Sequence, residues 1–278
     1  MQNFNVAVPT SFDEDEQINP GNTLKIVRYL AENGVRSFLL CGSTGEQHSL
    51  TLSEKLELLH VLEETDWPSD HEFLFGVAGI RQADAVQLAK AIGESRKVSA
   101  IMAGFPPYIR PTQKEALHYA QSVIETAGKP ALLYNNPSRT GFDLDIESVQ
   151  ELAKNDAVVA LKEAGDPDKV TVLKKTIDKP FAFFMGGESD MIDKLDAGYD
   201  AHSSVWGNLF PADIKAILDT YLEGDREKAL KLYGKLSAFL DSIKANSPLP
   251  FIKARLREKN VPAGICRLPL GGAQNEPS

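Results

Sequence analysis

Short apolar runs alternate with longer amphipathic segments along most of this chain, and this alternation limits its fold more than any other feature. We interpret the short apolar runs as strands and the segments between them as helices. The predicted strands are Asn5–Pro9, Ser37–Cys41, Glu72–Ala78, Ala100–Ala103, Ala131–Asn135, Val158–Lys162, Phe181–Met185 and Ala201–Val205.

The segments between these runs carry helix signals. Asn33-Gly34 provides a left-handed cap for the end of the first helix, and Glu54 and Glu57 suit the first turn of the second. The predicted helices are Asn22–Asn33, Ser53–Glu64, Ala83–Glu94, Thr112–Ala127, Ile146–Lys154, Asp168–Ile177 and Asp190–Ala197.

Strands that alternate with helices at this spacing require parallel pairing and right-handed crossovers. Eight such units close into a (β/α)8 TIM barrel, which is the predicted α/β fold. An open doubly wound sheet is the alternative, but no G-x-G-x-x-G motif follows the first strand. Strand signals stop after Phe210-Pro211. We therefore expect a barrel over residues 1–210 and a C-terminal helical extension over residues 211–278 that packs on the barrel.

Composition excludes several functional classes. The formal net charge is −9, which argues against binding to nucleic acid, although a local field can still attract an anionic substrate. No apolar stretch reaches the roughly 18 residues of a membrane span, and the N-terminus lacks the regions of a signal peptide. Cys41 and Cys266 show no spacing typical of a disulfide framework or a metal site, and Cys41 is expected to be a buried thiol. We expect a cytoplasmic protein without nucleic-acid or membrane partners.

Lys162 ends the sixth predicted strand, and Tyr134 lies at the end of the fifth. The active sites of such barrels lie at the carboxyl ends of their strands. Burial there disfavours the charged ammonium group and lowers the pKa of a lysine, and a neutral amine attacks carbonyl compounds. A neighbouring phenol can transfer protons. The pair predicts an enzyme that forms a Schiff base, whereas Glu163 points to the opposite face of the strand.

Other polar or small residues follow the same strand ends. The segment Gly42-Ser43-Thr44-Gly45 offers backbone N–H groups and two hydroxyls, which suit a carboxylate or phosphate. Its alternative interpretation is a turn whose hydroxyls cap the next helix. The remaining candidates at strand ends, or in the loops that follow them, are Tyr108, Arg139, Gly186 and Ser203.

Several candidates have an alternative interpretation when they are considered singly. The Lys162 side chain could extend into solvent, and Tyr134 could be a core aromatic residue with its hydroxyl at the rim. Arg139 could form a surface ion pair with Asp143 or Asp145. Their convergence at the strand ends of one barrel is what favours a functional site.

These residues and motifs resemble the dihydrodipicolinate synthase and N-acetylneuraminate lyase superfamily of class I pyruvate aldolases. The most specific elements are Gly42-Ser43-Thr44-Gly45-Glu46, Tyr134-Asn135-Asn136-Pro137-Ser138-Arg139-Thr140-Gly141 and Leu161-Lys162-Glu163-Ala164. The similarity extends from Ala7 to Leu270. It implies a (β/α)8 barrel with added helices, assembled as a homodimer or homotetramer.

The resemblance also implies a role for each candidate. Lys162 would form the imine with pyruvate, so no cofactor and no metal ion would be needed. Tyr134 would donate and accept protons. Ser43, where synthases usually carry threonine, would join Tyr134 and Tyr108 in a hydroxyl relay, with Tyr108 crossing a dimer interface. Thr44 and the backbone near Ser203 would hold the pyruvate carboxylate, and Gly186 would also contribute to substrate binding.

Arg139 bears on the second substrate. In the synthase branch, an arginine in this motif binds the carboxylate of L-aspartate semialdehyde, and a guanidinium suits such a group. The resemblance therefore implies condensation of pyruvate with L-aspartate semialdehyde, a step of lysine biosynthesis. Another class I pyruvate aldolase is the alternative, either a 2-keto-3-deoxy sugar acid aldolase or dehydratase, or an enzyme similar to N-acetylneuraminate lyase.

Two hypotheses come from other classes. One is a barrel without catalytic activity that senses a keto acid, and it differs from an enzyme in forming no reducible pyruvate adduct at Lys162. The other is a metal-dependent class II aldolase. The sequence has no H-E-x-x-H motif and no histidine cluster, which speaks against this second hypothesis.

Overall fold

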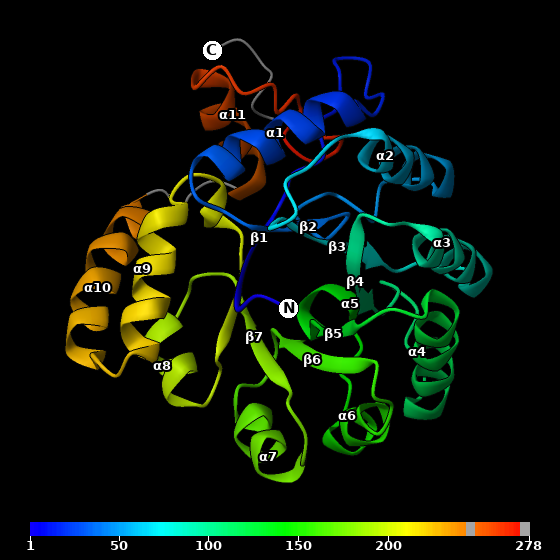
Figure 1. Ribbon diagram of the computed structural model, residues 1–278, viewed down its shortest axis with the longest axis vertical. Coiled ribbons are helices and arrows are strands. Elements are labelled where there is room, and N and C mark those ends of the chain that lie inside the picture. The colour runs from blue at the N-terminus through cyan, green and yellow to red at the C-terminus, as the bar shows by residue number, and fades with distance from the viewer. Residues whose placement is uncertain (243–247, 273–278) are drawn as a thin grey trace. The chain divides into compact units, whose positions relative to one another are not determined.

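Eight parallel strands form a closed barrel in chain order in this computed structural model, which describes residues 1–242 and 248–272. The predicted (β/α)8 barrel is confirmed. Figure 1 shows how the strands alternate with helices along the chain. The strands are β1 (Phe4–Ala7), β2 (Ser37–Leu40), β3 (Glu72–Val77), β4 (Val98–Gly104), β5 (Ala131–Asn135), β6 (Val158–Glu163), β7 (Ala182–Gly186) and β8 (Ala201–Ser204).

The helices within the barrel agree with the predicted ones to within one or two residues at each end. They are α1 (Pro20–Glu32), α2 (Leu52–Glu64), α3 (Gln82–Glu94), α4 (Gln113–Ala127), α6 (Ile146–Ala153), α7 (Asp168–Thr176) and α8 (Met191–Asp196). The short helix α5 (Pro137–Thr140) was not predicted, because a single turn has no amphipathic period. The 3₁₀ helix η1 (Trp206–Asn208), α9 (Pro211–Leu222), α10 (Arg226–Ser242) and α11 (Pro248–Glu258) follow β8.

Local sequence explains where these helices begin. Thr51 caps α2, two residues before the predicted start at Ser53: its hydroxyl oxygen accepts from Glu54 N, and the Glu54 carboxylate accepts from Thr51 N. Thr112 and Glu115 form the same reciprocal arrangement at α4. Such capping boxes satisfy N–H groups that the first helical turn leaves without partners. None of the described helices is long and apolar enough to cross a membrane.

The chain divides into two compact units. The first comprises residues 1–4 and 72–203, and the second comprises residues 5–71 and 204–278. The predicted extension over residues 211–278 begins where α9 begins, at Pro211. Residues 243–247 and 273–278 of that extension lie outside the described part of the chain. That the extension packs on the barrel stays a prediction.

Strand register in the first unit aligns the predicted site residues. Tyr134 of β5 is the Cα partner of Lys162 of β6, and Gly186 of β7 is the partner of Ser203 of β8. Side chains of paired residues in a parallel sheet point to the same face. The neighbours Leu133 and Leu161 are fully buried. Since the neighbouring Lys162 is also buried, β6 is covered on both faces at this end, as is typical of strands in a parallel barrel.

Candidate active site

Lys162 lies at the carboxyl end of β6, and only 6% of its surface is exposed. Its amine nitrogen lies 4.9 Å from the ring centroid of Tyr134 and donates a hydrogen bond to Ser203 Oγ at 2.9 Å. The structure thus brings together three of the predicted residues, one from each of β5, β6 and β8. The alternative in which Lys162 extends into solvent is wrong.

Burial lowers the pKa of the Lys162 amine. The Tyr134 phenol and the Glu188 carboxylate act in the opposite direction, whereas the positive charge of Arg139 lowers the pKa further. A lysine whose ammonium form is disfavoured keeps a reactive neutral amine at a lower pH than a solvated lysine. This arrangement can support nucleophilic attack on a carbonyl group.

Gly186 leaves room for the lysine side chain. A Cβ atom placed on Gly186 would lie 3.0 Å from Lys162 Cε, a closer approach than most Cβ atoms make. Any larger residue at this position would displace the methylene chain that carries the amine. The predicted contact of Gly186 with substrate stays a prediction.

Asn136 hydrogen-bonds to Tyr134, a contact that the sequence did not predict. Its Nδ2 donates to the Tyr134 hydroxyl oxygen at 2.7 Å, and 8% of the residue is exposed. Asn136 is also the N-cap of α5, where Oδ1 accepts a hydrogen bond from Arg139 N at 3.2 Å. An asparagine directly before a proline at the first helical position was a usable signal for the cap, but not for the contact with Tyr134.

Arg139 is exposed on α5, close enough to Lys162 for its charge to act on the amine. The two acidic residues considered as its surface partners have other contacts. Asp143 pairs with Lys169, and Asp145 caps α6 by accepting from Ser148 N at 2.8 Å. The predicted role of Arg139 in binding a substrate carboxylate stays a prediction.

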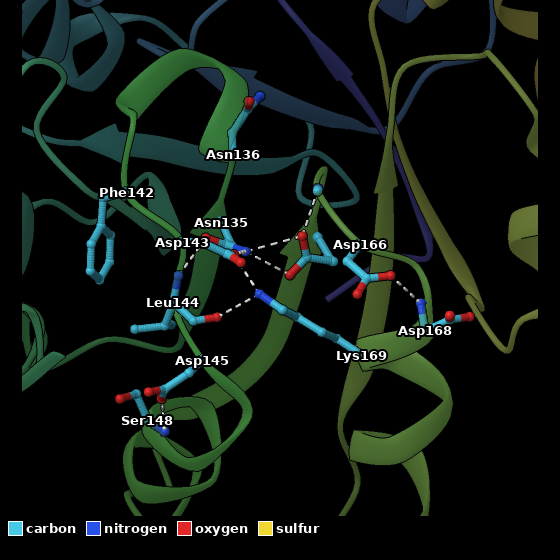
Figure 2. A network of polar contacts seen from close by, with 12 residues as sticks. Asn135, Asn136, Phe142, Asp143, Leu144, Asp145, Ser148, Asp166, Asp168 and Lys169 are labelled. Atoms are coloured by element: carbon cyan, nitrogen blue, oxygen red, sulfur yellow. Dashed lines mark hydrogen bonds and ion pairs between the residues drawn. The ribbon is translucent and has the colours of Figure 1, made fainter. Parts of the chain in front are cut away.

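A buried polar network supports the segment that carries Arg139 (Figure 2). Asn135 Nδ2 donates to both carboxylate oxygens of Glu163, at 3.1 and 2.8 Å, and Asn135 Oδ1 accepts from Leu144 N at 3.0 Å. Lys169 of α7 donates to Leu144 O at 2.9 Å and contacts Asp143. Burial raises the pKa of Glu163 to about 7. Both ends of the segment 136–144 are therefore attached to β5 and β6.

A buried acid that follows β7, Glu188, lies beside a buried imidazole within β8, His202. Glu188 Oε1 lies 3.6 Å from His202 Nε2, and both side chains are almost completely buried. Burial, with nearby Lys162 and Lys194, lowers the pKa of His202 to about 3, so the imidazole is neutral at neutral pH. The sequence assigns Glu188 no role, because a segment with a glycine pair followed by polar residues is equally typical of a pocket wall and of a capped turn.

Tyr108 differs from the residues around Lys162 in its exposure. The residue is 91% exposed, and its φ of 71° lies in the left-handed region that side chains disfavour. A tyrosine held in such a conformation presents its ring outward from the loop between β4 and α4. Its predicted place in a relay across a dimer interface stays a prediction.

Ser43 and Thr44 lie in the second unit, directly after β2. Their turn is shaped by Gly45, where an added Cβ would lie 3.1 Å from Val8 O and 3.2 Å from Cys41 N. Thr10 Oγ1 donates to Gly45 O at 2.7 Å. Cys41 is buried as predicted, and burial raises the pKa of its thiol to about 11, which makes it a poor nucleophile.

Within residues 1–242 and 248–272, no three His, Cys, Asp or Glu side chains are grouped so that they could hold a metal ion. The groups that act on the Lys162 amine by their charge are Tyr134, Glu188 and Arg139. Their chemistry suits nucleophilic attack and proton transfer.

Known proteins resemble this chain over nearly its whole length. The sequence model of the Dihydrodipicolinate synthetase family matches residues 1–278. A 4-hydroxy-tetrahydrodipicolinate synthase from Desulforamulus reducens is 31% identical over 270 residues, which cover 95% of this chain and 89% of that protein. A solved dihydrodipicolinate synthase from Bacillus anthracis has a TM-score of 0.87 at 26% identity, with 99% of this chain and 98% of that chain covered. CdNal from Clostridium difficile, solved in complex with mannosamine, has a TM-score of 0.91 at 24% identity and shares the fold over 97% of this chain and 93% of its own.

Proposed function

This chain belongs to the dihydrodipicolinate synthetase family, and from that premise we propose that it condenses pyruvate with L-aspartate semialdehyde, the 4-hydroxy-tetrahydrodipicolinate synthase reaction. The full-length relatives that bear this name support the reaction class, which is that of a lyase-type class I aldolase. The observation that carries the proposal is the buried Lys162 amine with its lowered pKa, next to the Tyr134 ring and bonded to Ser203.

In the proposed mechanism, the neutral Lys162 amine attacks the keto carbon of pyruvate. Tyr134 gives a proton to the hydroxyl group of the carbinolamine, which leaves as water and produces the imine. The imine withdraws electrons from the pyruvate methyl group, so a proton can leave it and the resulting enamine can attack an aldehyde. The imine itself serves as the electron sink, and the reaction needs no cofactor.

The other predicted residues complete the proposal. Thr44 and the backbone near Ser203 bind the pyruvate carboxylate, Gly186 contributes to substrate binding, and Ser43 passes protons between Tyr134 and Tyr108. Tyr108 comes from the partner in a homodimer or homotetramer, and its exposed side chain and unfavourable φ support a role at an interface. A biosynthetic reaction of this kind supports a cytoplasmic location.

Substitution of Tyr134 by phenylalanine is expected to lower kcat roughly 100-fold, the size of a typical general acid–base contribution. The phenyl ring fills the same space, so the fold and the stacking beneath the Lys162 amine remain. Steady-state kinetics and circular dichroism of the purified variant test this. Wild-type kcat in a folded Tyr134→Phe variant would show that another group transfers the proton.

Substitution of Arg139 by alanine is expected to raise the KM for the acceptor aldehyde by about 10- to 100-fold, because a charge-assisted hydrogen-bonded pair is lost. The KM for pyruvate should change much less, because pyruvate binds at Lys162. Arg139→Lys is the matched control and should recover part of the loss, since it keeps the charge without the planar fork. An equal rise in both KM values would contradict the assignment of Arg139 to the acceptor.

A substrate panel tests the proposed function directly. Pyruvate is offered with aspartate semialdehyde, N-acetylmannosamine and glyceraldehyde, and kcat/KM is compared. In parallel, borohydride reduction with pyruvate and peptide mass spectrometry locates the adduct. We expect the adduct on Lys162 and the highest kcat/KM with aspartate semialdehyde. Absence of the adduct would refute a Schiff-base enzyme, and a better acceptor would refute only the synthase reaction.

A second candidate function rests on Glu188. Its buried carboxylate lies close enough to Lys162 to raise the pKa of the amine. A carboxylate at this place accepts hydrogen bonds from the hydroxyl groups of a sugar and repels the carboxylate of aspartate semialdehyde. It favours cleavage of a 2-keto-3-deoxy sugar acid or of a compound similar to N-acetylneuraminate, and the sugar-derived aldehydes in the panel decide between the two reactions.

A further inference from the structure

We propose that Asn136 is a positioning residue that directs proton transfer by Tyr134 and couples it to the helix that carries Arg139. The inference rests on the proposed function, because it assigns Asn136 a part in the same Schiff-base reaction. It concerns a residue that touches the acid–base group and not the substrate.

The orientation of the Asn136 amide is fixed by its surroundings. Its Oδ1 accepts hydrogen bonds from Arg139 N at 3.2 Å and from Ser138 Oγ at 2.8 Å. A backbone N–H can only donate, so the atom that faces it must be the amide oxygen. The amide nitrogen therefore faces the Tyr134 hydroxyl, at 2.7 Å. With 8% exposure, the side chain is also shielded from competing water.

This contact restricts the phenol proton. The amide nitrogen has no acceptor capacity, so the hydroxyl hydrogen of Tyr134 cannot point toward Asn136. The hydroxyl hydrogen must therefore point in another direction, from which Tyr134 can donate it to the carbinolamine oxygen. When the proton leaves with the departing water, a phenolate remains, and the N–H of Asn136 stabilises that negative charge. The phenolate recovers a proton from the methyl group of the pyruvate imine, and Asn136 exchanges no proton itself.

The same side chain also caps α5. The cap holds the first turn of a four-residue helix, and this turn carries Arg139. A helix this short has little stability of its own and depends on its cap and its tertiary contacts. One amide thus connects the acid–base group to the residue proposed to bind the acceptor.

A purely structural role predicts a different behaviour from the proposed one. Aspartate is as good an N-cap as asparagine, so a cap alone would tolerate Asn136→Asp. Aspartate keeps the oxygen that accepts from Arg139 N but has no N–H for Tyr134, and its charge opposes a phenolate. Asn136→Ala removes the cap and the donor together. Asn136→Asp therefore tests the bond to the Tyr134 hydroxyl alone, and Asn136→Ala tests this bond together with the helix cap.

The experiment measures hydrogen–deuterium exchange of the pyruvate methyl group by NMR as a function of pD, which requires no acceptor aldehyde. For Asn136→Asp we expect an exchange rate about 10-fold lower and a pD profile moved upward by on the order of one unit, the size of a lost hydrogen bond to a charged group. The KM for aspartate semialdehyde should stay within about twofold of the wild-type value. Asn136→Ala should show the same loss together with a raised acceptor KM.

A wild-type rate and pD profile in Asn136→Asp would overturn the proposal and leave Asn136 as a helix cap only. Borohydride reduction with pyruvate accompanies each measurement. A wild-type protein without a Lys162 adduct would refute the proposed function, whereas an adduct with an unchanged profile in the variant refutes only this inference. If the aspartate variant does not fold, Asn136→Ser gives the same comparison, since serine caps helices and lacks the amide donor.

Discussion

Replacement of Lys162 by alanine is expected to lower kcat on the order of 10⁴-fold or more, as loss of a covalent nucleophile does in other enzymes. The variant should also form no pyruvate adduct on borohydride reduction. The reason is the position of the amine: it is buried, its pKa is lowered, and it lies against Tyr134 and Ser203. Kinetics and intact-protein mass spectrometry measure both effects.

Lys194 provides a matched control. Burial also lowers the pKa of this lysine on α8, but its amine donates to Ser189 O at 2.7 Å, in the loop before the helix. Lys194→Gln should therefore keep the adduct and most of the activity. If Lys162→Ala still trapped pyruvate, or if Lys194→Gln lost the adduct in a folded protein, the nucleophile would have been assigned to the wrong lysine. The comparison also shows whether a lysine with a lowered pKa, such as Lys194, can form the pyruvate adduct without a neighbouring phenol.

The sequence predicted the barrel and the residues at its strand ends for a physical reason. Parallel strands covered by helices must be apolar on both faces, so a lysine at the end of such a run stands out. Fold topology then places all strand ends at one edge, which is how Lys162, Tyr134 and Ser203 could be grouped before any coordinates were known. The chemistry of Lys162 follows from burial, and burial follows from the strand pattern.

What the sequence could not predict depends on single side-chain contacts. Nothing in the letters Asn135-Asn136 shows that the first amide bonds to Glu163 and the second to Tyr134. The two residues are neighbours, yet their side chains serve different networks because one ends a strand and the other caps a helix. The burial of Glu188 could not be predicted either, because it depends on the conformation of the loop after β7.

A second large effect is expected on stability, at a buried ion pair in the second unit. Lys253 of α11 is completely buried, and its amine donates to Glu46 Oε1 at 2.7 Å and to Ile265 O at 2.6 Å. The other oxygen of Glu46 accepts from Arg267 N at 3.0 Å. Substitution of Lys253 by alanine leaves a buried carboxylate without its cation and should lower the free energy of unfolding by about 3–5 kcal/mol.

Arg255 is the matched control for this prediction, because it lies on the same helix and pairs with Glu258 at 2.7 Å on the surface. Arg255→Ala should cost about 0–1 kcal/mol, since solvent screens an exposed pair. Urea denaturation measures both free energies. A Lys253→Ala variant that loses no more stability than Arg255→Ala would show that water or rearrangement compensates the Glu46 carboxylate.

The double variant Glu46→Gln with Lys253→Met shows whether the loss of stability comes from the unpaired Glu46 charge or from the loss of the ion pair itself. Two neutral side chains of similar size remove the charges together, and exchange of a buried ion pair for neutral groups is often close to neutral in stability. We therefore expect the double variant to regain most of what Lys253→Ala loses. If it also regains wild-type turnover, the pair serves only the fold. If stability returns but turnover does not, Glu46 contributes to the Gly42–Glu46 segment through its charge, because that segment also carries Ser43 and Thr44.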